Sequence, residues 1–254
     1  MTADRLRGIA DDLRICLLFS TRLPIPHSMP IAGADIARAS WALPLIGMLI
    51  GLFGTAAYWV AFELGLPPLV CAALALVATL AATGCLHEDG LADAADGLFG
   101  GRDREERLAI MRDSRIGSYG ACALTISLIL RTGALAGLAG PAAVALALIG
   151  SHAGARAMMP PFLQLVPAAR ADGLAAGAGR PPQPRAALAT LLGIIAVIAA
   201  LGTRRGLLAL LLLIALFVAM RRLCLRLIGG QTGDAVGALE QLSEVLILLT
   251  AAAA

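Results

Sequence analysis

Long apolar stretches, interrupted by short polar ones, dominate the chain. A helix that crosses a membrane needs about 17 to 25 mostly apolar residues. Seven stretches have this length and character: residues 40–64, 67–84, 118–138, 140–157, 186–202, 206–224 and 235–254. They are rich in alanine and glycine, which lets neighbouring helices approach closely. The pattern predicts an all-α, polytopic integral membrane bundle of about seven transmembrane helices, formed as a single membrane domain by residues 1–254.

The segment before these stretches has a different pattern. Its apolar residues stand at positions 6, 9, 10, 13, 16 and 17, a spacing that places them on one face of a helix. Three acidic and three basic residues among the first 20 argue against a cleavable signal peptide. The segment therefore predicts an N-terminal interfacial helix that lies along the membrane surface.

Threading the chain through a bilayer puts its long polar segments on one side. These segments are residues 1–39, 85–117, 157–185 and 225–234. The composition is that of a membrane protein, with 59% hydrophobic and 15% charged residues. There is no lysine, and the arginines lie on this side or at the adjoining span ends, except Arg131, Arg204 and Arg205. The positive-inside rule makes this side cytoplasmic.

An acidic run, HEDGLADAADG, occupies residues 87–97. On a helix, Asp89, Asp93 and Asp96 are spaced i, i+4 and i+7 and share one face, where they would repel one another. No basic residue stands between positions 87 and 101 to neutralise them. A divalent metal with oxygen ligands would keep these carboxylates ionised. The run therefore predicts a metal site made of the three aspartates, with His87 beside it to bind metal or relay a proton.

The segment RDSR, residues 112–115, directly precedes the third predicted span. Guanidinium groups form bidentate hydrogen bonds with phosphates. Arg112 and Arg115 could therefore clamp a diphosphate near the acidic run. Residues 103–106 are instead expected to belong to a solvated helix.

The last predicted span opens with GQTGD, residues 230–234. Thr232 or Asp234 could cap this helix, and the amides at a helix start also attract anions. Glu240 and Glu244 follow inside the span, where acidic residues are costly and usually face the bundle interior. A functional role is expected for these two, in preference to a purely structural pairing with arginine.

The remaining motifs narrow the class of chemistry. No Walker loop, GxSxG elbow or HExxH motif occurs, so neither an ATP motor nor a serine hydrolase is indicated. His27 and His152 are expected in packing or interface roles. Packing is also expected for the scattered cysteines, which are Cys16, Cys71, Cys85, Cys122 and Cys224. What remains is a membrane enzyme that transfers a phosphoryl-linked group directly with the help of a metal.

Four stretches of this sequence together resemble one known family. They are TRLPIP at 21–26, HEDGLADAADG at 87–97, RLAIMRDSRIGSYG at 107–120 and GQTGD at 230–234. On these motifs the chain is identified as a member of the cobalamin synthase family, the adenosylcobinamide-GDP ribazoletransferases. The resemblance implies an Mg²⁺-dependent transferase of vitamin B12 biosynthesis that joins adenosylcobinamide-GDP to α-ribazole, or to its 5′-phosphate, and releases GMP.

The resemblance also implies where this enzyme acts. It would be a multi-pass protein of the bacterial inner (cytoplasmic) membrane, with its active site in segments 85–117 and 225–234 facing the cytoplasm. Its partners would be the two small-molecule substrates and the lipid bilayer, with no nucleic acid. Association into a homo-oligomer stays open.

On this resemblance the residues singled out above receive roles. Asp89, Asp93 and Asp96 would hold one or two Mg²⁺. Glu88 would be a further ligand, although the family commonly has an aliphatic residue at its position. Either His87 or Asp113 would remove the proton of the attacking ribazole hydroxyl. The predicted substrate contacts are Arg112, Ser114, Arg115, Thr232 and Asp234.

Two other readings compete with this one. A CDP-alcohol phosphotransferase would also use carboxylate-bound metal, but its D-G-x2-A-R motif fails here because Ala92 and Asp93 stand where Ala-Arg is required. A cation transporter would line its path with acidic residues near the membrane midplane. Such proteins often contain internal repeats, and the two halves of this chain show no convincing similarity.

Overall fold

The structure is a computed structural model that describes residues 3–26 and 32–253. His27 lies outside the described residues. In the described part of the chain every regular element is a helix, apart from an isolated bridge between Ala168 and Gln231. The helices are α1 (Ala3–Ser20), α2 (Gly33–Ala39), η1 (Ser40–Ala42), α3 (Leu43–Glu63), α4 (Pro68–Thr83), α5 (Leu86–Gly100), α6 (Arg104–Ile110), α7 (Ser118–Ala136), α8 (Pro141–Ala157), α9 (Met159–Leu165), α10 (Leu174–Ala178), α11 (Gln183–Ile228) and α12 (Gly233–Ala252). The prediction of an all-α fold is confirmed.

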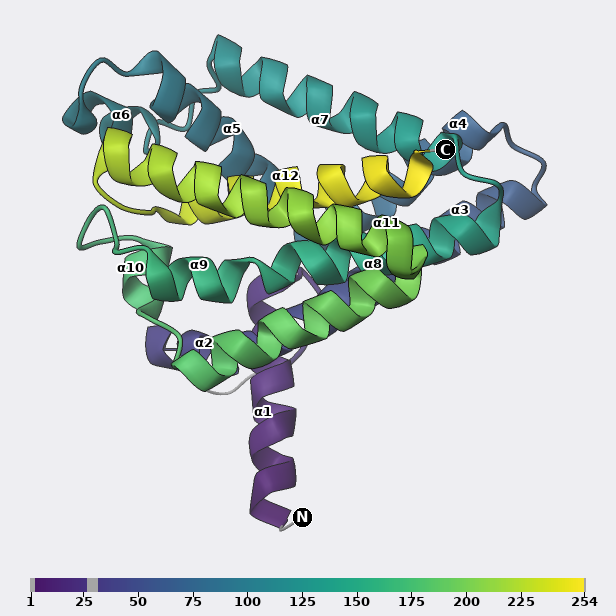
Figure 1. The fold of residues 1–254 in the computed structure, drawn as a ribbon, viewed down its shortest axis with the longest axis horizontal. Helices are drawn as coiled ribbons and strands as arrows, with labels where there is room; N and C mark the ends of the chain where they lie inside the picture. Colours follow the sequence, from purple (N-terminus) through teal and green to yellow (C-terminus); the bar gives the residue numbers. More distant parts are fainter. Residues whose placement is uncertain (1–2, 27–31, 254) are drawn as a thin grey trace.

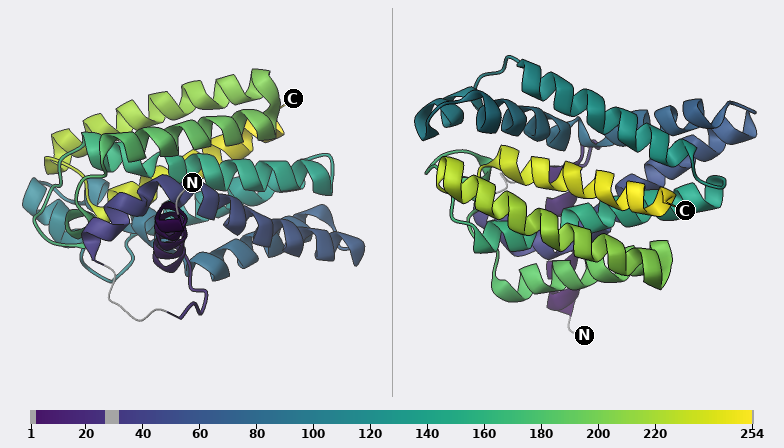
Figure 2. Two further views of the ribbon diagram at one scale, coloured as in Figure 1. Left: turned by 90° about the horizontal axis from the view of Figure 1, so that it is seen from below. Right: turned by 45° about the horizontal axis from the view of Figure 1, so that its top comes forward.

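The long helices lie side by side and form a bundle (Figures 1 and 2). Among the described residues five helical segments are long and apolar enough to cross a membrane, and there are six if the bent pair of α4 and α5 counts as one span. Gly202 interrupts α11 with a φ of 74°, and Figure 1 shows the second leg of this helix turning back toward the end of the bundle where the first leg begins. α11 therefore supplies two of the seven predicted spans, and the polytopic bundle is confirmed.

The connections of the bundle gather at two opposite ends. Figure 1 shows the α3–α4 and α7–α8 turns at one end, on the right, and α6, α9, α10 and the start of α12 at the other. The segments that were predicted to carry the chemistry therefore share one end of the molecule.

The acidic run forms a helix inside this bundle. α4 ends at Thr83, Gly84 and Cys85 adopt left-handed backbone angles, and α5 departs at 90°. α5 then packs against α12 and α7. A Cβ added to Gly90 would lie only 3.2 Å from the Cα of Gly237, so this pair of glycines lets α5 and α12 cross closely. The crossing holds the acidic run against the first turns of α12.

α1 projects from the bundle at a steep angle to the long helices (Figure 1), which suits a helix lying along a membrane surface. Asp12 anchors this helix. Its carboxylate is 2% exposed and accepts hydrogen bonds from Trp41 Nε1 at 2.8 Å and Arg185 Nη1 at 3.3 Å. Arg38 completes the ion pairing of Asp12. α1 is therefore tied to α2, η1 and α11 by one buried carboxylate.

The cysteines are all free, but they differ in burial. Cys16, Cys71 and Cys224 are buried, in agreement with the predicted packing role. Burial raises the pKa of the Cys16 thiol to about 12, so this group is inert. Cys85 and Cys122 are exposed, and the packing prediction is wrong for them.

Candidate active site

α5 presents two kinds of residue on two sides. His87 and Glu88 point into the bundle and are 3% and 8% exposed. Asp89 is exposed, and Asp93 is half-buried. The division follows from helix geometry, because consecutive residues stand about 100° apart around the axis. One step along α5 therefore separates the bundle interior from an open acidic face.

The acidic face combines residues from two helices. Asp89 and Asp93 on α5 lie close enough to Asp234, in the first turn of α12, for the three charges to repel one another. Within the described residues this group makes one ion pair, in which Arg170 Nη2 lies 3.5 Å from Asp234 Oδ2. The structure thus brings Asp234, predicted as a substrate contact, to the predicted metal ligands Asp89 and Asp93.

Asp96 is turned toward a different partner. One of its carboxylate oxygens accepts a hydrogen bond from the Gly117 amide at 2.7 Å, and the other accepts one from the Gly120 amide at 2.9 Å. These amides begin α7, so Asp96 caps that helix from outside its sequence. The carboxylate would also meet any Cβ at Gly120 within 2.4 Å, which leaves room only for glycine there.

Two cavities meet at Asp89. The first cavity, of about 330 Å³, has His87, Asp89, Arg170 and Asp234 on its polar side. The second cavity, of about 270 Å³, lies between α4, α5 and α7 and is lined by Asp89, Asp93 and Ser114 among others. Asp89 therefore stands between two spaces large enough for parts of a small-molecule substrate.

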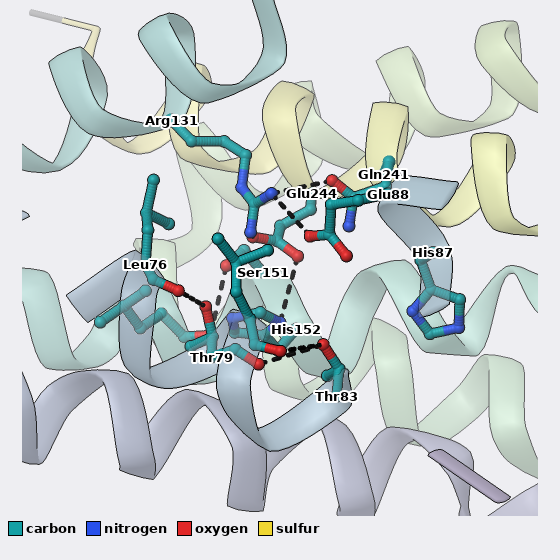
Figure 3. Close-up of polar contacts among 12 residues, drawn as sticks. Leu76, Thr79, Thr83, His87, Glu88, Arg131, Ser151, His152, Gln241 and Glu244 are labelled. Carbon is teal, nitrogen blue, oxygen red and sulfur yellow. Dashed lines mark hydrogen bonds and ion pairs between the residues drawn. The ribbon is translucent and has the colours of Figure 1, made fainter. Parts of the chain in front are cut away.

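A buried ion-pair network fills the bundle behind this face (Figure 3). Arg131 of α7 is 1% exposed and donates to Glu88 Oε1 at 3.0 Å and to Gln241 Oε1 at 2.9 Å. Its other terminal nitrogen lies 2.8 Å from Glu244. His152 Nδ1 is 3.1 Å from the second oxygen of Glu244. This arm of the network joins α5, α7, α8 and α12.

A second arm reaches His87. Arg156 of α8 is 1% exposed, and its Nη1 lies 2.7 Å from Glu240 Oε1. His87 Nδ1 is 3.4 Å from both Glu240 Oε2 and Arg156 Nη2. His87 Nε2, in contrast, has no hydrogen-bond partner among the described residues. The two arms together fix the inner side of α5. His87 Nε2, which belongs to a residue lining the first cavity, is left without a partner.

This network changes the expectation for several residues. Glu240 and Glu244 pair with arginine, which is the structural arrangement that the sequence argument disfavoured. Glu88, predicted as a metal ligand, is ion-paired with Arg131. Arg131 itself was threaded away from the polar side, yet its side chain lies inside the bundle. The physical reason is that a charged group in an apolar bundle needs an opposite charge, and these groups supply it to one another.

A metal-like grouping also occurs within the network. Among the described residues, His152, Glu240 and Glu244 form one group of potential metal ligands. Their ligand atoms lie within 4.8 Å of one another. Two guanidiniums already contact these carboxylates, at 2.8 Å from Arg131 and 2.7 Å from Arg156. Their positive charges neutralise the site and oppose a further cation. Neither Asp96 nor Asp234 forms so tight a group with Asp89 and Asp93 among the described residues, and Asp96 is held by the start of α7.

The predicted phosphate clamp lies on the loop between α6 and α7, and its arginines are paired. Arg112 Nη2 binds both oxygens of Asp172, at 2.6 and 2.7 Å. Arg115 binds Asp113 at 2.7 Å, and this guanidinium lowers the pKa of the exposed carboxyl. Ser114, between them, lines the second cavity. The loop therefore borders the site, with both guanidiniums held by carboxylates.

Thr232 is an N-cap. Its hydroxyl accepts a hydrogen bond from the Ala235 amide at 3.2 Å, and the side chain is 2% exposed. The capping role that the sequence suggested is therefore present, and the substrate contact stays a prediction. Asp234, two positions later, is free to face the first cavity.

Sequence reasoning missed three arginines. Arg131 and Arg156 hold the buried network, and Arg170 faces Asp234. A signal was present for the first, since arginine inside an apolar span is costly unless a carboxylate meets it. Glu240 and Glu244, one helical turn apart in another span, were the matching carboxylates. No comparable signal marks Arg170, which lies in an irregular segment.

Fold and site together define a polytopic helical membrane protein with an acidic site between two cavities. Comparison with known sequences specifies the family. Residues 12–252 match the family described as cobalamin-5-phosphate synthase, and the chain belongs to it. A protein of Bradyrhizobium diazoefficiens is 52% identical, over 98% of this chain and 96% of its own length. One of Mesorhizobium japonicum is 49% identical, over 98% and 95%. Both are named adenosylcobinamide-GDP ribazoletransferase. No solved structure matches this chain.

Proposed function

We propose that this protein joins adenosylcobinamide-GDP to α-ribazole, or to α-ribazole 5′-phosphate, and releases GMP. Membership of the family and the names of the relatives support the reaction. The observation that carries it to this site is the placing of Asp89 between two cavities, beside Asp93 and Asp234. A two-substrate transfer needs such a junction, because the reacting groups must meet at one charged point.

The bonds exchanged are defined by the reactants. A hydroxyl oxygen of the ribazole ribose bonds to the phosphorus on the cobinamide side of the diphosphate. The bond from that phosphorus to the bridging oxygen breaks, and GMP takes this oxygen with its electron pair. Since the 5′-phosphorylated compound is also proposed as an acceptor, the attacking group is a secondary hydroxyl of the ribose.

Asp89, Asp93 and Asp234 are suited to hold Mg²⁺. All their ligand atoms are carboxylate oxygens, which a hard divalent cation prefers. The three charges repel one another, and Arg170 provides a single ion pair at 3.5 Å. When bound, Mg²⁺ would neutralise charge on the diphosphate and on the departing oxygen. Asp96 is still proposed as a ligand. Its carboxylate also caps α7, so the same oxygens would serve both roles.

The acceptor proton is proposed to go to His87. Its Nε2 is buried, has no partner in the described part of the chain, and belongs to a side chain that lines the first cavity. Asp113, the other base that was predicted, is partly exposed and ion-paired with Arg115. Ser114 lines the second cavity, and its sequence neighbours Arg112 and Arg115 could exchange their present carboxylate partners for the diphosphate.

The setting of the reaction is also a proposal. The apolar helices indicate a multi-pass membrane protein, and the named relatives come from bacteria. We place it in the inner membrane with the acidic face toward the cytoplasm, because the arginine-rich connections share that end of the bundle. A homo-oligomer is compatible with this arrangement.

Activity of the purified protein in lipid nanodiscs tests the proposal. Adenosylcobinamide-GDP, α-ribazole and Mg²⁺ should give cobalamin and GMP in equal amounts, and chelation of Mg²⁺ should stop both. Release of CMP from a CDP-alcohol, with no GMP from the proposed donor, would favour the phosphotransferase reading. Cation flux in liposomes without any product would favour a transporter.

A further inference from the structure

We propose that the first cavity is the acceptor subsite, in which the benzimidazole base of α-ribazole lies against an apolar wall and its ribose faces Asp89. The inference rests on the proposed function and assigns one of its two substrates to one place. The cavity has about 330 Å³, near the lower end of the range of small-molecule sites. This size suits a nucleoside.

The first cavity is lined by both apolar and polar residues. Large apolar side chains among them are Phe19 of α1, Leu43 of α3, and Met159 and Leu163 of α9. A flat bicyclic base with methyl substituents would gain most from such a surface, because aromatic rings bury a large apolar area. The charged and polar residues of its lining include His87 and Asp89 of α5, Asp234 of α12, and Arg170.

Two polar atoms on residues of this lining lack partners. His87 Nε2 and Arg170 Nη1 are both buried and make no hydrogen bond within the described residues. Buried polar atoms are normally paired, so unpaired atoms on two residues that line one cavity favour a polar ligand there. Ribose hydroxyls donate and accept hydrogen bonds and could satisfy both atoms.

The second cavity is the better place for the donor. It borders Ser114 on the loop that carries Arg112 and Arg115, and Ile116 and Leu128 on its rim are exposed. A large donor can reach this side without entering the bundle. Because in-line transfer places the attacking and leaving oxygens on opposite sides of phosphorus, acceptor and donor should approach Asp89 from different directions. Asp89 lines both cavities, as that geometry requires.

Equilibrium dialysis of α-ribazole against the protein in nanodiscs tests the assignment, with and without Mg²⁺. Leu163→Trp fills the first cavity, and Leu128→Trp is the matched control in the second. We expect Leu163→Trp to weaken α-ribazole binding at least about 10-fold and to raise its KM, with the donor KM unchanged. Leu128→Trp should leave α-ribazole binding within about twofold of the wild type. The reverse pattern would place the acceptor in the second cavity and overturn the proposal.

A smaller side chain guards against a folding defect. Leu163→Ala enlarges the first cavity without steric strain. It should increase the binding of a naphthimidazole riboside, whose base has one more fused ring, relative to α-ribazole. No change in this ratio, in a variant with a normal unfolding temperature, would also overturn the assignment.

Binding and turnover separate the two levels of inference. If α-ribazole binding follows the pattern above but the wild type releases no GMP from adenosylcobinamide-GDP, the reaction is wrong and the subsite stands. If the wild type turns over and Leu163→Trp changes neither binding nor KM, the subsite is wrong and the reaction stands. Absence of α-ribazole binding to an active wild-type protein, as when lipid fills the cavity, also rejects the subsite.

Discussion

Glu88 and Asp89 are neighbours on α5 but belong to two regions with opposite electrostatics. Glu88 enters a network in which Arg131 and Arg156 meet Glu88, Glu240 and Glu244 inside the bundle. Asp89 belongs to an open acidic face where the described residues provide one ion pair, that of Arg170 with Asp234. Matched charges hold helices together, whereas unmatched ones are ready to receive a cation. The comparison teaches that acidic residues in this bundle are sorted by their partners.

The close packing of α5 makes the two regions depend on each other. The network fixes the inner side of α5 through α7, α8 and α12, and the Gly90–Gly237 crossing fixes its distance from α12. Asp89 and Asp234 are carried by these same two helices. Rigid support of this kind lets repelling carboxylates stay together before any ligand binds.

The largest effect is expected from Arg131→Met. The change leaves Glu88 and Glu244 buried without their main cation, and breaking such a pair costs about 3 to 5 kcal/mol. The unfolding temperature in detergent and the yield of folded protein measure this loss. Arg115→Met, in an exposed ion pair, is the control and should change little. Equal stability of the two variants would show that the network does not support the bundle.

The next effect in size is expected from Asp89→Asn. The variant should lose more than about 100-fold in turnover, since even residues behind a metal ligand typically cost 10- to 100-fold. It should unfold at the same or a higher temperature than the wild type, because it relieves repulsion with Asp93 and Asp234. Turnover against Mg²⁺ concentration is the measurement. Near-normal rates at limiting Mg²⁺ would remove Asp89 from the metal site.

Much of this arrangement could be predicted from the sequence, for identifiable reasons. Apolar length predicts the spans, and the i, i+4, i+7 spacing predicts that α5 carries an acidic face. What pairs with what depended on tertiary structure. Arg131 meets Glu88 across 43 positions of sequence and Gln241 across 110, and no local pattern contains such distances. The same limit explains Asp96, whose spacing resembles that of a metal ligand although its oxygens meet the α7 amides.

Substitutions of Asp96 decide on which side of the comparison this residue belongs. Asp96→Ala should lower the free energy of unfolding by about 0.5 to 2 kcal/mol, because the Gly117 and Gly120 amides lose their acceptor. Asp96→Asn keeps one acceptor oxygen but turns its NH2 group toward the other backbone amide, so it should recover only part of that loss. Chemical denaturation measures stability, and turnover against Mg²⁺ measures ligation. A stable Asp96→Asn protein with a weakened Mg²⁺ response would assign the carboxylate to the metal as well.

The smallest effect is expected from Asp113→Asn. Arg115 lowers the pKa of this carboxyl below its ordinary value of about 3.9. The stabilisation from the pair is therefore present above about pH 3.9 and is lost as the pH falls through the lower, folded-state pKa. Since the side chains are exposed, that contribution is small.

A group that is already ionised cannot produce a change in rate near neutral pH. The pH–rate profiles of Asp113→Asn and the wild type should therefore overlap between about pH 5 and 9, with similar kcat. His87→Gln is the comparison variant, and it should lower kcat while lowering the unfolding temperature less than Arg131→Met does. Loss of kcat in Asp113→Asn with a normal His87→Gln protein would return the role of proton acceptor to the exposed loop. The acidic face would then extend beyond α5 and α12 to the segment before α7.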